Sequence, residues 1–281
     1  MKDKILTPKQ IEAFIAHLTR DEKSQNTIEK YLRDIRAFAS YINNGRITKE
    51  TVIAYKTKLL SENYAPRSIN SMLASMNSLF TFLDWTDLKV KSIKVQQQIY
   101  CSEERELTKE EYIRLVNTAR QKGNERLNLL LQTICGTGIR VSELPYITVE
   151  AIQCGEAVVS LKGKTRSVFI VRELQKKLLG YAKSQKISTG AIFVTRNGKP
   201  MSRTNIWREM KSLCLQAGVN PQKVFPHNLR HLFARTFYGI EKDIAKLADI
   251  LGHSSINTTR IYIMATGNEH RQRMENMRLI I

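Results

Sequence analysis

The residues best suited to chemistry gather near the carboxyl end of the chain. Three of the five histidines fall between residues 226 and 262. Arg230 follows His227 by three positions, so one turn of a helix places both side chains on one face. Guanidinium groups bind anionic oxygens in pairs, imidazoles accept or donate protons, and a tyrosine oxygen such as that of Tyr262 can act as a nucleophile. This combination suits a phosphate group under attack.

His227 directly follows Pro226, a residue that favours the first position of a helix. An imidazole there lies close to a helix N-terminus, which attracts anions. The alternative is that each histidine is a satisfied core or capping residue, and that Tyr262 is a packing residue. His253, in Leu-Gly-His, adds a second imidazole nine residues before the tyrosine.

Two groups earlier in the chain could complete such a site. Arg140 follows a Gly-Thr-Gly break and precedes Glu143 by three residues, so a carboxylate could hold its guanidinium. The same spacing also fits an ordinary surface ion pair. A basic segment with Lys162 and Lys164 lies at the tip of an expected hairpin, where it could deliver a proton donor or form a solvated turn.

The charge of the chain points to a polyanionic partner. Its formal net charge is +19 and its isoelectric point is about 9.9. The surplus is +6 over residues 1–95 and +13 over the remainder, so it is spread over both parts of the chain. Nucleic acid is the commonest partner of such a protein, and two basic parts would suit a clamp. A basic protein of unrelated function is the alternative.

Other site classes find little support in the sequence. The four cysteines contain no Cys-x-x-Cys pair, which argues against a zinc site and a disulfide scaffold and fits reduced thiols in a cytoplasm. The chain start lacks the apolar core of a signal peptide, and no stretch approaches the roughly 20 apolar residues of a membrane span. With no acidic cluster to bind a metal ion, we expect neither metal nor other cofactor. The expected location is the cytoplasm.

The elements that position these residues divide into two parts. Four amphipathic helices are expected over residues 1–88, opened by Thr7-Pro8, Ser24, Thr48 and Pro66. Together they form a small bundle. Residues 89–105 are rich in lysine and glutamine and show no periodicity, which indicates a linker between domains.

Residues 106–281 are expected to form a second domain, mainly helical with a small β-sheet. Its predicted elements are a helix behind a capping box at Thr108, an apolar helix over 126–135, helix again over 139–144, a hairpin over 157–171, a second hairpin over 190–201, and a helix over 202–217. The rest is expected to be helical, apart from the segment after His253. An apolar tail closes the chain, to pack on its own domain or on a neighbouring subunit.

The ordered set of motifs resembles the tyrosine recombinase (phage integrase) family, and its Xer-like members in particular. The matching segments are Gly-Thr-Gly-Ile-Arg-Val-Ser-Glu-Leu at 136–144, the hairpin with Lys162, Pro-His-Asn-Leu-Arg-His at 226–231, Leu-Gly-His-Ser at 251–254 and Thr-Thr-Arg-Ile-Tyr at 258–262. They span the second domain. The first domain is similar, less specifically, to the family's helical core-binding (SAM-like) domain.

The resemblance implies a role for each residue. Arg140 and Arg230 would bind the scissile phosphate. The two histidines, His227 and His253, would donate to its oxygens, and His227 could also take the proton from the phenol. The family pattern makes Tyr262 the nucleophile of a 3′-phosphotyrosyl bond, has Glu143 orient Arg140, and assigns the leaving oxygen's proton to Lys162. The hairpin is one residue shorter than the family form, so Lys164 is the alternative acid. The implied catalytic set is Arg140, Lys162, His227, Arg230, His253 and Tyr262.

The resemblance also implies partners and a reaction. The expected substrate is double-stranded DNA with inverted-repeat sites, bound by a homotetramer that works through a Holliday junction and is monomeric or weakly associated when free. A requirement for an accessory protein or a second recombinase is left open, as is the choice between integration, excision and resolution. The alternatives are a type IB-like topoisomerase, which shares the chemistry, and a DNA-binding regulator with a decayed site.

Overall fold

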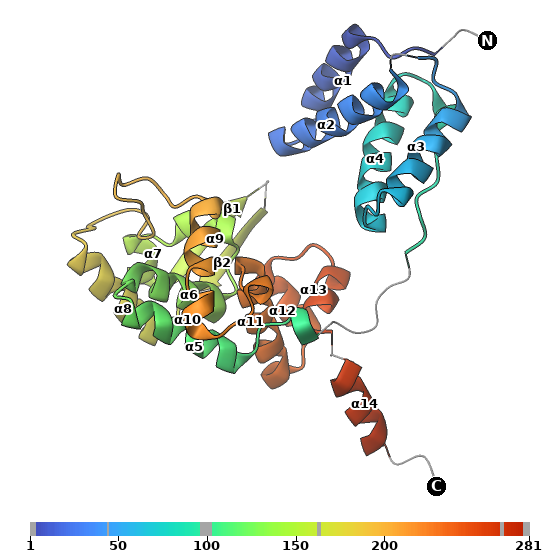
Figure 1. Cartoon of the computed structure of the whole chain (residues 1–281). Helices are drawn as coiled ribbons and strands as arrows, with labels where there is room; N and C mark the ends of the chain where they lie inside the picture. The colour runs from blue at the N-terminus through green and yellow to red at the C-terminus, as the bar shows by residue number, and fades with distance from the viewer. Residues whose placement is uncertain (1–3, 44, 96–102, 162–163, 265–266, 278–281) are drawn as a thin grey trace. The chain divides into compact units, whose positions relative to one another are not determined.

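A computed structural model describes residues 4–43, 45–95, 103–161, 164–264 and 267–277 (Figure 1). The chain divides into two compact units, Met1–Gln97 and Gln98–Ile281. Each has its own hydrophobic core, and no buried residue is shared between the cores. No helix in the described ranges is both long and apolar enough to cross a membrane.

The first unit is the predicted bundle of four helices. They are α1 (Pro8–Arg20), α2 (Gln25–Ile42), α3 (Lys49–Ser61) and α4 (Pro66–Phe82), followed by the 3-10 turn η1 (Thr86–Leu88). Thr7, Ser24 and Thr48 accept backbone hydrogen bonds as the N-caps of the first three helices. Pro66 occupies the first turn of α4, where its missing N–H costs nothing. All four predicted helix starts are thus confirmed.

The core of this unit contains a charged residue that periodicity alone would have left outside. Phe14, Phe38 and Phe80 are at most 1% exposed. Asp34 on α2 is also buried, where Lys30 approaches its carboxylate at 2.7 Å and the Ser75 hydroxyl donates to it at 2.8 Å. These contacts join α2 to α4 and satisfy a carboxylate that would otherwise be costly to bury.

The described start of the predicted linker packs on the bundle. Val90 is buried in its core, and the side-chain amide of Asn77 bonds both to its N–H and to its carbonyl. Asn70 binds both backbone groups of Ile93 in the same way. The segment therefore continues the first unit beyond η1. Residues 96–102 of the linker lie outside the described ranges, and the boundaries at 88 and 105 stay predictions.

The second unit confirms the predicted fold class, mainly helical with a small sheet (Figure 1). The sheet consists of β1 (Glu156–Leu161) and β2 (Lys164–Phe169), antiparallel, with Glu156 opposite Phe169. The helices are α5 (Lys109–Gln121), α6 (Glu125–Thr137), α7 (Val149–Cys154), α8 (Arg172–Ser184), α9 (Arg203–Lys211), α10 (Cys214–Ala217), α11 (Pro226–Glu241), α12 (Ile244–Leu251), α13 (Ile256–Tyr262) and α14 (Gly267–Asn276), with 3-10 turns η2 (Glu103–Arg105), η3 (Val141–Tyr146) and η4 (Pro221–Lys223).

Helix α6 lies at the centre of this unit and packs against α5, α8 and α11. Leu127, Leu130 and Ile134 are fully buried, as their apolar run predicts. The helix ends at Gly138, whose φ of 64° is left-handed. A Cβ there would lie 2.5 Å from the ring of Phe233, so only glycine fits this turn. The turn leads the chain directly to Arg140.

Three predicted elements before α11 differ from the structure. The helix expected over 139–144 is the 3-10 turn η3 rather than an α-helix. Residues 190–201 form no strands but only two isolated bridges, Thr148 to Ala191 and Val194 to Pro200, although Gly198 provides the expected left-handed turn. The helix predicted over 202–217 has its Ser202 cap and its stop at Gly218, but it is interrupted between α9 and α10.

The prediction that the segment after His253 is not helical was wrong. Ser255 caps the short helix α13, which ends at Tyr262. Thr259 and Tyr262 are its two buried residues, one turn apart. A helix of seven residues shows too few turns for periodicity to reveal, and tertiary packing of these two side chains stabilises it instead.

Candidate active site

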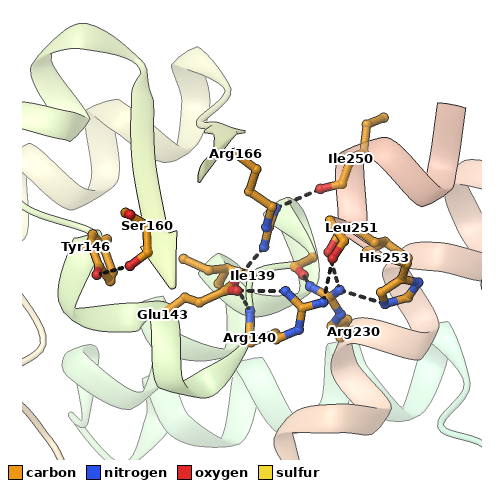
Figure 2. Close-up of polar contacts among 12 residues, drawn as sticks. Ile139, Arg140, Glu143, Tyr146, Ser160, Arg166, Arg230, Ile250, Leu251 and His253 are labelled. Atoms are coloured by element: carbon orange, nitrogen blue, oxygen red, sulfur yellow. Dashed lines mark hydrogen bonds and ion pairs between the residues drawn. The ribbon is translucent and has the colours of Figure 1, made fainter. Parts of the chain in front are cut away.

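Helix α11 positions the first two predicted site residues. Pro226 occupies its first turn and His227 follows immediately. Arg230 lies one turn further, on the same face, and is only 1% exposed. Figure 2 shows its guanidinium pointing toward the residues at the end of α12 and toward Arg140. The proximity inferred from sequence spacing is therefore present in the fold.

Glu143 holds two arginines at once. Arg140 Nη1 donates to Glu143 Oε1 at 2.7 Å, and the backbone N–H of Arg140 donates to Oε2 at 2.9 Å. Arg166 Nη2 donates to the same Oε2 at 2.6 Å (Figure 2). Burial favours a higher pKa for Glu143, but the hydrogen bonds and charges of both arginines outweigh it and lower the pKa. The carboxylate is thus an ionised counter-charge beneath the two guanidiniums.

Arg166 is the part of this arrangement that sequence reasoning missed. Its side chain crosses from β2 to α12, where Nη1 donates to the carbonyl of Ile250 at 2.7 Å. The available signal was strand alternation, because Arg166 lies opposite buried Val159 and two residues before buried Val168. An arginine on the buried face of a two-stranded sheet needs an acidic partner, and Glu143 is that partner.

The predicted proton donor falls at the tip of this hairpin. Lys162 lies outside the described residues. Lys164 begins β2, but its side chain is likewise outside what the structure describes. The choice between them therefore stays a prediction.

Arg230 is held by the backbone of two other segments. It donates to the carbonyl of Gly138 through Nη1 and to the carbonyl of Leu251 through Nη2, the latter at 2.6 Å. Arg140 Nη2 donates to the next carbonyl, that of Gly252, at 3.0 Å, so the two guanidiniums meet at the end of α12. Burial and then the charge of Arg140 lower the pKa of Arg230 to about 10, which leaves it cationic at neutral pH.

His253 connects Arg230 to α13. Its Nε2 lies 3.0 Å from Arg230 Nη2, and its Nδ1 lies 2.9 Å from the hydroxyl of Thr259. Burial, followed by the charges of Arg230 and Arg140, lowers the pKa of His253 to about 4. The pKa of His227 is also lowered to about 4, by burial first and then by the neighbouring His231 and arginines. Both imidazoles are therefore neutral in the resting protein at neutral pH.

Tyr262 completes the cluster from within the same chain. Tyr262 is 6% exposed, and its hydroxyl lies 3.4 Å from Nδ1 of His227. The guanidinium carbon of Arg230 is 5.9 Å from the ring centroid. The rings of His227 and His253 lie 5.0 and 4.9 Å from it. Of the predicted site residues, all six with described side chains are thus joined by this network of contacts: Arg140, Glu143, His227, Arg230, His253 and Tyr262.

The arrangement combines three chemical capacities. A neutral imidazole beside a phenol can accept its proton, a phenolate can attack an electrophile, and buried guanidiniums can stabilise the charge that develops on an anion. Arg230 Nε is buried and has no hydrogen-bond partner among the described residues, which leaves it as a possible donor to a substrate. Among the described residues, no group of three or more histidine, cysteine or acidic side chains is placed to hold a metal ion.

Both units of the chain match known protein families. The phage integrase family matches residues 105–269, and the phage integrase N-terminal SAM-like domain matches residues 11–87. The tyrosine recombinase XerA of Pyrococcus furiosus is 29% identical over 290 residues, covering 100% of this chain and 98% of its own length. The tyrosine recombinase XerD of Halalkalibacterium halodurans is 30% identical over 269 residues, covering 88% and 90%.

Solved structures give the same result for the fold. The crystal structure of XerA recombinase is 25% identical with a TM-score of 0.55, over 97% of this chain and 99% of that one. A lambda integrase dimer bound to a COC′ core site shares the fold at 17% identity, with a TM-score of 0.75 over 93% and 96% of the two chains. This chain belongs to the phage integrase family and is a tyrosine recombinase, an enzyme that cleaves and rejoins DNA.

Proposed function

We propose that Tyr262 is the nucleophile of this recombinase and that His227 accepts its proton. The observation that carries this is the 3.4 Å separation between the Tyr262 hydroxyl and Nδ1 of a histidine held neutral at neutral pH. Hydrogen bonds of catalytic pairs are often long before substrate binds, and they shorten in the reactive complex. A free phenol has a pKa of about 10, so such an acceptor is needed near neutral pH.

In this proposal the cleavage step is a transesterification, which exchanges one phosphate ester bond for another. The phenol oxygen attacks phosphorus, its proton passes to His227, and the bond from phosphorus to the 5′ oxygen breaks. A 3′-phosphotyrosyl ester forms, and the leaving oxygen takes a proton from Lys162 or, alternatively, Lys164. Because the ester conserves the energy of the phosphodiester, a second 5′ hydroxyl can reverse the step and rejoin strands without ATP.

The remaining residues stabilise the phosphate. Arg140 and Arg230 would bind its non-bridging oxygens, and His253 would donate a further hydrogen bond. Glu143 supports Arg140 by fixing its guanidinium, as the 2.7 Å contact between them suggests. Two arginines and two histidines supply the stabilisation that divalent ions supply in other phosphoryl-transfer sites, so the proposed reaction needs no metal ion.

We also propose that the substrate is double-stranded DNA, in line with the net charge of +19 and with structural relatives solved as DNA complexes. In that proposal the recombining assembly is a homotetramer on inverted-repeat sites that passes through a Holliday junction, and the α14 tail docks on a neighbouring subunit. The proposal leaves open whether an accessory protein or a second recombinase takes part. It places the reaction in the cytoplasm. The alternatives of a topoisomerase or a decayed regulator are not favoured, because the relatives are named as recombinases and integrases.

A suicide-substrate assay tests the nucleophile. Nicked duplexes that tile the DNA flanking the gene are incubated with the full chain, and covalent adducts are resolved by denaturing electrophoresis and mapped by mass spectrometry. The expected result is an adduct on Tyr262 in the wild type and none in Tyr262→Phe. Tyr238→Phe, a neighbouring tyrosine on α11, is the matched control and should react normally. An adduct that survives Tyr262→Phe, or that maps to another residue, contradicts the proposal.

A further inference from the structure

Among the described residues, the aromatic ring nearest to Tyr262 belongs to a residue that the proposed reaction does not use. His231, one turn beyond His227 on α11, lies 4.2 Å from the Tyr262 ring, centroid to centroid, with an interplanar angle of 32°. The rings of His227 and His253 are farther away and more steeply inclined. His231 therefore forms the wall against which the phenol ring lies, whereas His227 faces the phenol oxygen.

A carboxylate from outside the catalytic helices faces this imidazole. Glu106 Oε1 lies 3.6 Å from His231 Nδ1, within ion-pair range and slightly beyond a hydrogen bond. Both side chains are close to nine-tenths buried, at 13% and 12% exposed. Within the described part of the chain His231 Nδ1 has no hydrogen-bond partner, and Glu106 is the acidic group that faces it.

Glu106 is itself held in place. Arg235 Nη1 lies 3.7 Å from its other carboxylate oxygen. Burial favours a higher pKa for Glu106, but the polar contact with His231 and the charge of Arg235 outweigh it and lower the pKa, so the carboxyl is ionised near neutral pH. The neighbouring carbonyl, that of Arg105, accepts a hydrogen bond from Asn228 at 2.6 Å. Residues 105 and 106 thus bind one face of α11 at three successive turns.

We propose that Glu106 and His231 are positioning residues for the nucleophile. The carboxylate fixes the rotation of the imidazole, and the imidazole fixes the plane of the Tyr262 ring, so that the phenol oxygen stays directed at His227. This inference rests on the assignment of Tyr262 as the nucleophile. The chain enters the catalytic unit through η2 and Glu106. In this proposal that segment also supplies one side of the pocket around the nucleophile.

The alternative is that His231 serves only as apolar packing. A phenylalanine would then do equally well, and the charge of Glu106 would not affect catalysis. The positioning role instead predicts that the polar contact is required, because a misdirected nucleophile can cost a factor of about 10 or more in rate even when binding is unchanged. It also predicts that the two residues act together rather than independently.

The test compares five variants of the full chain in single-turnover cleavage of the suicide substrate at saturating enzyme. Glu106→Gln removes the charge, Glu106→Asp restores it, and His231→Phe keeps an aromatic wall without the polar atom. Their double variant, Glu106→Gln with His231→Phe, measures coupling. Glu104→Gln is the matched control, because it removes the same charge from an exposed position two residues away.

We expect Glu106→Gln and His231→Phe each to slow cleavage about 10-fold while DNA affinity, measured by gel shift, is unchanged. The double variant should be no slower than either single variant, Glu106→Asp should recover most of the rate, and Glu104→Gln should match the wild type. Unaltered cleavage in Glu106→Gln, additive losses in the double variant, or equal losses in Glu106→Gln and Glu106→Asp would overturn the proposal.

A second measurement needs neither DNA nor turnover. In protein carrying ¹³C-labelled tyrosine, the Tyr262 ring signal is assigned by its disappearance in Tyr262→Phe. It should shift in Glu106→Gln and stay in place in Glu104→Gln, both recorded below the melting temperature. A fall in thermal stability with an unmoved Tyr262 signal overturns the positioning role. An unexpected adduct in Tyr262→Phe would instead refute the proposed nucleophile, so the two failures are distinguishable.

Discussion

Replacing Glu143 with glutamine should weaken the fold and the chemistry together. The side chain is 2% exposed and is the shared acceptor of Arg140 and Arg166. Glutamine has nearly the same shape but carries no charge and only one acceptor oxygen. Two guanidiniums would then lie side by side over a neutral group, and one of them would lose its partner.

The size of the effect follows from the exposure of the two partners. Hydrogen bonds to charged groups contribute about 1.5–3 kcal/mol each when buried. The Arg166 side chain is 12% exposed, so its bond counts at about 2 kcal/mol, whereas the Arg140 side chain is 36% exposed and solvent reduces its bond to about 1 kcal/mol. A total of about 3 kcal/mol corresponds to a fall of about 6–12 °C in the melting temperature of a unit of this size.

Calorimetry of the wild type, Glu143→Gln and the control Glu173→Gln measures this fall. The Glu173 side chain is 81% exposed and pairs with Lys177 at 3.3 Å, so its replacement should change stability by less than about 0.5 kcal/mol. Because the folded-state pKa of Glu143 lies below its ordinary value of 4.5, its contribution is complete above that pH and is lost as the pH falls through the folded pKa. The gap between wild type and Glu143→Gln should therefore narrow under acid conditions.

Single-turnover cleavage by the same proteins checks the second half of the prediction. With Arg140 no longer fixed, the rate of Glu143→Gln should drop about 10-fold or more at temperatures where the variant is fully folded. If Glu143→Gln melts and cleaves like Glu173→Gln at neutral pH, the shared carboxylate has no such role. A difference in stability between wild type and Glu143→Gln that does not change with pH would equally contradict an ionised, charge-bearing Glu143.

Two further outcomes follow from the site. Gly252→Ala should slow cleavage, because φ at Gly252 is +63° and a Cβ there would clash with Arg166 Cδ. The control Gly218→Ala, at φ +60° with open space around it, should lose only about 1 kcal/mol of stability in thermal melts, from backbone strain. Equal cleavage rates in the two variants would contradict this expectation. Burial lowers the pKa values of His227 and His253 from 6.5 to about 4, so the unfolded chain binds more protons than the folded chain between these pH values, and the free energy of unfolding should fall as the pH drops from 6.5 to 4. Urea unfolding at several pH values should show a smaller fall in this free energy for His253→Gln than for the wild type. An identical fall in both proteins would contradict the burial of the His253 ring.

Much of the fold could be predicted because its signals are local. Thr7, Ser24, Thr48 and Thr108 each precede a helix and each accept the cap hydrogen bond that their position predicts. Local signals were insufficient where tertiary contacts decide, as in α13, a helix too short to be stable without packing. Residues 190–201 show the reverse case, since a correct turn residue did not suffice to form strands.

The sequence predicted which residue types form the site and their order along the chain. It predicted fewer of the contacts between them. The spacing of His227 and Arg230 on one helix, and of Arg140 and Glu143 on one turn, is a local property. The contact of Arg166 with Glu143 spans 23 residues, and no spacing rule encodes it. The contact of Glu106 with His231 is more distant still in sequence, so only the folded chain shows it.

Three segments meet at Arg230, so this side chain holds the fold together in addition to its proposed role in binding the phosphate. Its guanidinium bridges the end of α6, through Gly138, to the end of α12, through Leu251, while the residue itself is anchored in α11. Removing it would separate these segments as well as disarm the site. An inactive Arg230 variant is therefore ambiguous evidence about catalysis until its folding has been measured, whereas a variant at the half-buried Arg140 can be interpreted more directly.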